Sequence, residues 1–102
     1  MNINEDIWIG LLQVSSRSKN GLLGSSSGAY VNVLAKAKNS NDFIEKVKKA
    51  VNELDLDFVE INEIDLFNER QKKFKINNSI ICIAKDVTKS KELRFGNFHT
   101  YE

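Results

Sequence analysis

Residues 39–54, NSNDFIEKVKKAVNEL, decide the fold because they carry the clearest helix signal in the chain. Residues 39–42 are typical of a helix N-cap, and Asp42 suits the positive end of the helix dipole. Lysines and Asn52 occupy one face. Apolar residues recur on the other at spacings of three and four, the period of a helix. We therefore predict an amphipathic helix that packs on a sheet through Phe43, Val47, Val51 and Leu54.

Strand signals lie on both sides of this helix. Residues 29–38 alternate with period two, placing Val31 and Val33 on one face, so they predict a half-buried strand. Residues 57–67, DFVEINEIDLF, begin a second alternation that switches phase after Ile61. Because a slip of one residue turns every side chain to the other face, we predict a bulge or break near Asn62 and Glu63.

The two ends of the chain also predict strands. Residues 7–14, IWIGLLQV, are apolar on both alternating sets, which is typical of a central strand or one covered on both faces. Gly10 and the leucines leave a helical start open. Residues 93–102 are aromatic and alternating, with Phe98 on one face, and they predict a terminal strand. Its other face would carry Leu93, Phe95, His99 and Tyr101.

The segment between these strands is harder to assign. Residues 68–75 are polar and basic and predict a surface connection. Residues 77–79 then resemble a cap for a second helix, whose inner face would carry Ile80, Val87 and either Ile83 or Ala84. A buried strand is the alternative, since the apolar run is short and β-branched. We take the helix as the prediction.

Together these segments give the order strand, strand, helix, strand, helix, strand. This predicts an α+β fold, in which one long and one short helix pack on one face of a mainly antiparallel β-sheet. A chain of 102 residues matches one domain, which we expect to span residues 1–102.

Composition excludes several classes of protein. The formal net charge of +1 gives no bulk attraction to nucleic acid or to a membrane surface. The longest apolar run has five residues, and the N-terminus lacks the features of a signal peptide. Cys82 is the only cysteine and lies within that run, so we expect a buried, reduced thiol and a cytoplasmic protein.

The residues for catalysis or cofactor binding are sparse. One cysteine and one histidine cannot form a structural zinc site, and the acids show no calcium-loop pattern, so we expect neither metal nor cofactor. His99 is interpreted as a packing residue rather than a base. The loop at residues 15–28 contains Gly21, Gly24 and Gly28, whose spacing fits a hairpin loop better than a phosphate cradle. Leu22 and Leu23 in that loop either pin it to the core or face a partner. We expect no enzymatic activity.

Charge is segregated along the chain. Residues 53–69 contain acids and no base, whereas residues 70–94 contain eight bases and two acids. One interpretation is a pair of solvated edges. The other is an acidic strand edge that binds a basic partner, helped by electrostatic steering. The candidate partner-binding residues are Asp55, Asp57, Glu60, Glu63, Asp65 and Glu69.

The stretch at residues 30–69 and the ending FGNFHTY at residues 95–101 are similar to immunity proteins of bacterial toxin systems, including contact-dependent growth inhibition. This resemblance implies a protein that binds one cognate toxin, commonly a basic nuclease, and blocks its active site or substrate groove. The acids would then replace nucleic-acid phosphates.

Three other hypotheses remain open. The first is a nucleic-acid-binding or regulatory module. The lysines and arginines in residues 70–75 and 85–94 would contact phosphates, and Phe74, Phe95 or Phe98 would stack on nucleobases. A small ligand-binding domain or enzyme could use the loop at residues 15–28 and His99. Edge strands and aromatic side chains in residues 95–101 could also pair two copies into a homodimer.

Overall fold

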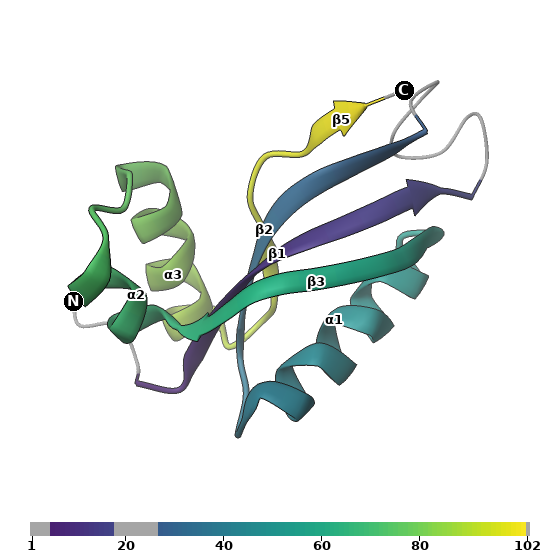
Figure 1. The fold of residues 1–102 in the computed structure, drawn as a ribbon. Coiled ribbons are helices and arrows are strands. Elements are labelled where there is room, and N and C mark those ends of the chain that lie inside the picture. The colour runs from purple at the N-terminus through teal and green to yellow at the C-terminus, as the bar shows by residue number, and fades with distance from the viewer. Residues whose placement is uncertain (1–4, 18–26, 102) are drawn as a thin grey trace.

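An antiparallel sheet organises the fold (Figure 1). The structure is a computed structural model that describes residues 5–17 and 27–101. Within these residues the strands are β1 (Ile7–Ser16), β2 (Gly28–Lys36), β3 (Leu56–Leu66), β4 (Arg94–Phe95) and β5 (His99–Tyr101). The helices are α1 (Ser40–Glu53), α2 (Phe67–Lys73) and α3 (Asn78–Ser90). The sheet order is β3-β1-β2-β4, and β5 also pairs directly with β2.

The central strand β1 pairs on both sides, as its sequence predicts. Its register with β2 runs unbroken from Ile7 opposite Lys36 to Ser15 opposite Gly28, and β3 pairs with its other edge. The open question of a helical start is therefore settled in favour of a strand.

One face of the sheet is covered by α1. Phe43, Val47 and Val51 are buried there, as predicted, against residues from the strands. Leu54 is only partly buried, at the margin of the same cluster. The strand residues in this cluster are Leu12, Val14, Ala29, Val31, Val33, Ala35 and Leu56.

The start of α1 is fixed by two hydrogen bonds that both involve Asp42. The Asn39 side chain accepts one from the backbone N–H of Asp42 at 2.8 Å, which confirms the predicted N-cap. The Asp42 carboxylate in turn accepts one from the backbone N–H of Lys38 at 2.9 Å. That bond, with a smaller effect from the nearby Lys46 charge, lowers the pKa of Asp42 below its ordinary value.

The opposite face of the sheet is covered by α2 and α3. Ile7, Ile9 and Leu34 form a second apolar cluster with Phe67 of α2 and with Ala84 and Val87 of α3. Because successive side chains of a strand point to opposite faces, Ile7 and Ile9 lie across the sheet from Leu12 and Val14. The predicted α+β class and mainly antiparallel sheet are confirmed. The helices, however, divide between both faces instead of sharing one, because β1 and β2 present apolar side chains on both.

The predicted irregularity in β3 is present. The register with β1 shifts between the pairs Leu11–Asn62 and Ile9–Asp65, and Glu63 has a φ of 54°. This bulge explains the change of apolar phase, since Ile61 and Ile64 both pack on the α1 side. A second register shift falls between Phe58 and Glu60.

The region after β3 corrects one prediction and confirms another. Residues 67–73 form the helix α2, not a surface connection, and Phe67 is fully buried. Residues 78–90 form the predicted helix α3, whose cap Asn77 accepts a hydrogen bond from the Ile80 backbone N–H at 3.0 Å. Cys82 is exposed, so the expectation of a buried thiol is wrong. In a helix that buries Ala84 and Val87, position 82 lies on the outer face.

The C-terminal strand is shorter and more broken than predicted. Phe95 pairs with Val33 in β4, and His99 pairs with Tyr30 in β5. Leu93, Phe95 and Phe98 pack on the α1 cluster, with the two phenylalanine rings 5.7 Å apart. The predicted common face for Leu93, Phe95, His99 and Tyr101 is therefore wrong, because residues 96–98 interrupt the alternation.

Gly28 serves close packing at the start of β2. A Cβ there would lie 2.5 Å from both the Val14 carbonyl oxygen and the Tyr101 hydroxyl. Gly21, Gly24, Leu22 and Leu23 lie outside the described residues. In the described part of the chain, no helix combines the length and apolar character needed to cross a membrane.

Replacing Phe43 with alanine should cost about 3–5 kcal/mol of unfolding free energy, because its fully buried ring joins α1 to the sheet. The Phe43 ring stacks against the Trp8 ring, with 6.5 Å between the ring centroids. Urea unfolding measures the loss. The control Val59→Ala, at a side chain that is 47% exposed, should change stability by less than about 0.5 kcal/mol. Equal losses in the two variants would contradict this account of the core.

Candidate functional site

The outer edge of β3 gathers most of the predicted acidic residues. β3 is the terminal strand of the sheet, so in the described chain one of its two edges has no partner strand. Asp57, Glu60, Glu63 and Asp65 lie on β3 itself, whereas Asp55 directly precedes it and Glu69 lies on α2. The structure thus brings four of the six candidates onto one strand. We call this surface the acidic edge.

At one end of the acidic edge, Arg17 neutralises two carboxylates. Its Nε donates to Asp57 Oδ1 at 3.0 Å, and its Nη1 lies 3.4 Å from Asp55 Oδ1. Its Nη2 also donates to the Leu56 carbonyl oxygen at 2.7 Å. The guanidinium therefore bridges the start of β3 to the end of β1.

At the other end, Arg70 has the same role. Its Nε donates to Asp65 Oδ2 at 2.9 Å, and its Nη2 donates to the backbone carbonyl of Glu63 at the bulge. The Arg70 side chain is only 16% exposed. Nearby, Lys72 pairs with Glu69 at 3.2 Å on the surface of α2.

At the centre of the acidic edge, the charges of Glu60 and Glu63 are not neutralised by an ion pair within the described residues. Within the described residues, no cation forms an ion pair with the carboxylate of Glu60 or Glu63. Glu60 accepts one hydrogen bond, from the Asn62 amide at 3.1 Å. Of the six candidate residues, Glu60 and Glu63 are therefore the two whose carboxylates form no ion pair in the described chain. They lie between the carboxylates that pair with Arg17 and Arg70.

Sequence reasoning missed both arginines. Arg17 lies 38 residues before Asp55, and no local pattern predicts that contact. Arg70 stands at the boundary between the acidic and basic segments, and its spacing of five residues from Asp65 becomes a contact only because α2 turns back after β3. A helical assignment for residues 67–73 would have provided that signal.

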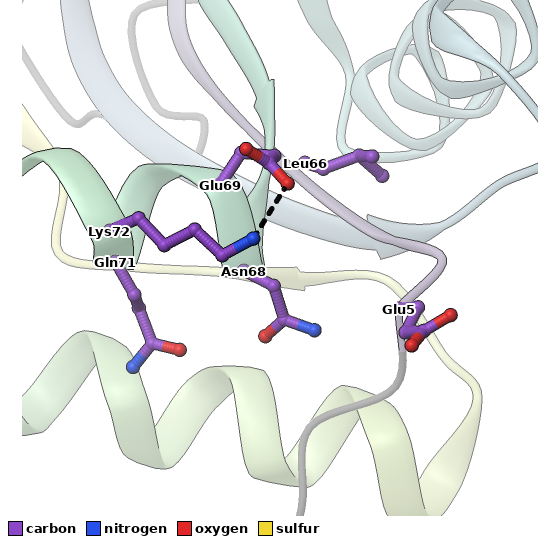
Figure 2. Close-up of a pocket in the computed structure, with 6 residues that line it drawn as sticks. All are labelled: Glu5, Leu66, Asn68, Glu69, Gln71 and Lys72. Carbon is purple, nitrogen blue, oxygen red and sulfur yellow. Dashed lines mark hydrogen bonds and ion pairs between the residues drawn. The ribbon is translucent and has the colours of Figure 1, made fainter.

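A hollow of about 660 Å³ lies beside α2 (Figure 2). Asn68 and Gln71 extend together on one side of the helix, whereas the Glu69–Lys72 pair lies on another. Glu5 and Leu66 complete the lining. The Glu69 carboxylate at this hollow is already paired with Lys72.

A smaller pocket of about 310 Å³ lies between the sheet and the α2–α3 connection. It borders the acidic edge, because Glu63 and Arg70 line it. Its remaining lining residues are Ile9, Asn32, Phe74, Lys75, Ile76, Asn77 and Ile80.

Several of the described basic residues are already paired with carboxylates. Arg70 and Lys72 are held in ion pairs. Lys91 lines a shallow groove with lysines of β2 and α1, but Lys36 there pairs with Asp6 at 3.6 Å and Lys46 with Asp42 at 3.4 Å. Of the three phenylalanines considered for base stacking, Phe74 is exposed, whereas Phe95 and Phe98 pack on the core.

His99 is exposed on β5, and in the described residues no hydrogen bond or ion pair joins it to a carboxylate. Tyr101, also considered for a homodimer interface, accepts a hydrogen bond from the Gln13 amide at 2.8 Å and lies 5.4 Å from the Tyr30 ring. Among residues 5–17 and 27–101, no three His, Cys, Asp or Glu side chains cluster as metal ligands.

Comparison with known proteins gives no match to a family model, to a curated protein or to a solved structure.

Replacing Arg70 with glutamine should lower the unfolding free energy by about 1.5–3 kcal/mol, because charge-assisted hydrogen bonds of a mostly buried group are lost. Lys72→Gln removes an equal charge two residues along α2 at a side chain that is 72% exposed, and should cost less than about 1 kcal/mol. Thermal unfolding at low and high salt compares the two. Similar losses would show that Arg70 does not fix the bulge.

Proposed function

We propose that this chain binds and neutralises a basic protein toxin, acting by binding rather than by catalysis, as immunity proteins do. The observation that carries the proposal is the pair of unpaired carboxylates, Glu60 and Glu63, on a strand edge that has no partner in the described residues. Carboxylates in this position can replace the phosphates that a basic nuclease recognises. Occupying the substrate groove would then block the enzyme.

The arginine ion pairs at both ends of the acidic edge support this proposal, because they concentrate the negative charge at its centre. Arg17 and Arg70 reduce the negative charge at the ends of β3 and leave it at the centre. A partner's cations are therefore attracted to Glu60 and Glu63, and complementary charge both speeds encounter and fixes register.

The bulges on β3 favour contacts through side chains. Regular backbone pairing on the outer edge would have to pass the register shifts at Val59 and Glu63. A bulge also turns the local strand and re-aims its side chains. We therefore infer that the partner docks on carboxylates and not by adding a strand to the sheet.

The test is binding of the protein encoded by the neighbouring gene, measured by surface plasmon resonance, which gives the association and dissociation rates as well as the affinity. Glu60→Lys with Glu63→Lys should weaken affinity at least about tenfold, mainly by slowing association, and should reduce the salt dependence. The matched control, Glu45→Lys with Glu53→Lys on α1, changes the net charge equally and should leave affinity within about twofold. Unchanged affinity in the β3 variant would reject the acidic edge as the binding site.

A further inference from the structure

The acidic edge is suited to orienting a partner rather than holding it. Exposed ion pairs contribute little net affinity, because solvent and salt screen them. Tight protein interfaces depend instead on a few aromatic or apolar anchors that lose contact with water at the centre of the interface. An anchor site for this chain should therefore be an apolar pocket that continues from the acidic edge.

The 310 Å³ pocket beside Glu63 continues from the acidic edge and has a mixed lining, in which the apolar residues are Ile9, Phe74, Ile76 and Ile80. Ile9 of β1 is buried at its base, and Ile80 of α3 is half-buried. Phe74 forms part of its wall with a side chain that is 63% exposed, the most exposed large apolar group in the described chain. The volume is at the lower end of the ~300–1,000 Å³ range of ligand pockets, which suits a single side chain.

The lining charges favour an uncharged occupant. Arg70 is paired with Asp65, and the two other charged groups at the pocket, Glu63 and Lys75, have opposite signs. Neither a cation nor an anion is strongly preferred, so the attraction comes from the apolar base and from Phe74.

One uncharged polar side chain of the lining, that of Asn32, is available for hydrogen bonding. Asn77 is committed, because its Oδ1 accepts from the Ile80 backbone N–H and from the Ser79 hydroxyl. The backbone carbonyl of Asn32 accepts from the Gly96 N–H at 2.7 Å, but its side-chain amide has no partner within the described residues. A ring with its own N–H or O–H would satisfy this amide.

We propose that the pocket receives an aromatic side chain with a hydrogen-bonding edge, tryptophan or tyrosine, from the protein that binds the acidic edge. The ring packs on Phe74, Ile9 and Ile80, and its N–H or O–H donates to Asn32 Oδ1. This inference rests on the proposed function for the source of the ring. The pocket's preference for the ring depends only on the residues that line it.

N-acetyl-tryptophanamide is a neutral probe for this preference. Titrated into the ¹⁵N-labelled chain, it should shift the amide signals of Ile9, Asn32 and Ile80 with a dissociation constant of about 1–10 mM, a magnitude typical of a fragment. Phe74→Ala should weaken binding at least about fivefold, and N-acetyl-alaninamide should cause no comparable shifts. Phe74 is exposed enough for the variant to fold.

The control is Tyr30→Ala, which removes another exposed ring, two residues before Asn32 on β2 but outside the lining of the pocket. It should leave probe binding unchanged. Shifts scattered over the surface, or equal loss of binding in both variants, would overturn the pocket.

The partner protein separates this inference from the proposed function. If both hold, Phe74→Ala accelerates dissociation at least about tenfold, whereas the lysine variants at Glu60 and Glu63 mainly slow association. Normal probe binding with no effect of the lysine variants on the partner would reject the proposed function alone. Loss of partner affinity in the lysine variants, with no effect of Phe74→Ala and no probe binding, would reject the pocket alone.

Discussion

The burial of β1 on both faces is the constraint on which the rest of the structure depends. Ile7 and Ile9 point to one side of the sheet, and Leu12 and Val14 to the other, so neither face can remain open to water along the whole strand. The helix α1 covers one side, and α2 with α3 covers part of the other. Because α2 follows β3 directly, this covering also carries Arg70 back to the edge of the sheet, where it holds Asp65 and the Glu63 carbonyl.

Charge and apolar surface therefore meet at one corner of the molecule. The bulge at Glu63 places part of the acidic edge beside the α2–α3 connection, where Phe74 is exposed. A partner attracted by Glu60 and Glu63 would find an apolar anchor within the same footprint. Long-range attraction and short-range packing would then come from adjacent parts of one surface, which combines fast encounter with slow release.

Local periodicity predicted the parts of the fold that depend on local patterns. The α1 face, its Asn39 cap and the phase change in β3 follow from side-chain direction in helices and strands, and the structure confirms all three. The helix α2 was missed because it has only seven residues and buries one side chain, Phe67, which the sequence assigned to the preceding strand. The inner face of α3, with Ala84 and Val87, was predicted correctly. The face of the sheet that α3 covers was not predicted, since the second set of β1 side chains determines where that helix packs.

The candidate site was predictable only in composition. The acidic run identified six candidate residues, but not that Arg17 and Arg70 pair with three of the six, Asp55, Asp57 and Asp65. Nor did any spacing predict that Ile9, Asn32 and Ile80 meet at one pocket, because these residues come from three elements joined by tertiary packing. Contacts between distant segments are set by packing of the whole chain.

The two register shifts in β3 have a consequence for the protein's behaviour in a crowded cell. A long, flat strand with an unsatisfied backbone edge is a template for self-association into fibrils. Here the edge is interrupted at Val59 and Glu63, so straight backbone pairing extends over only a few residues before it fails. The same irregularities that interrupt the pairing of β3 with β1 therefore disfavour the stacking of identical copies along the outer edge of β3.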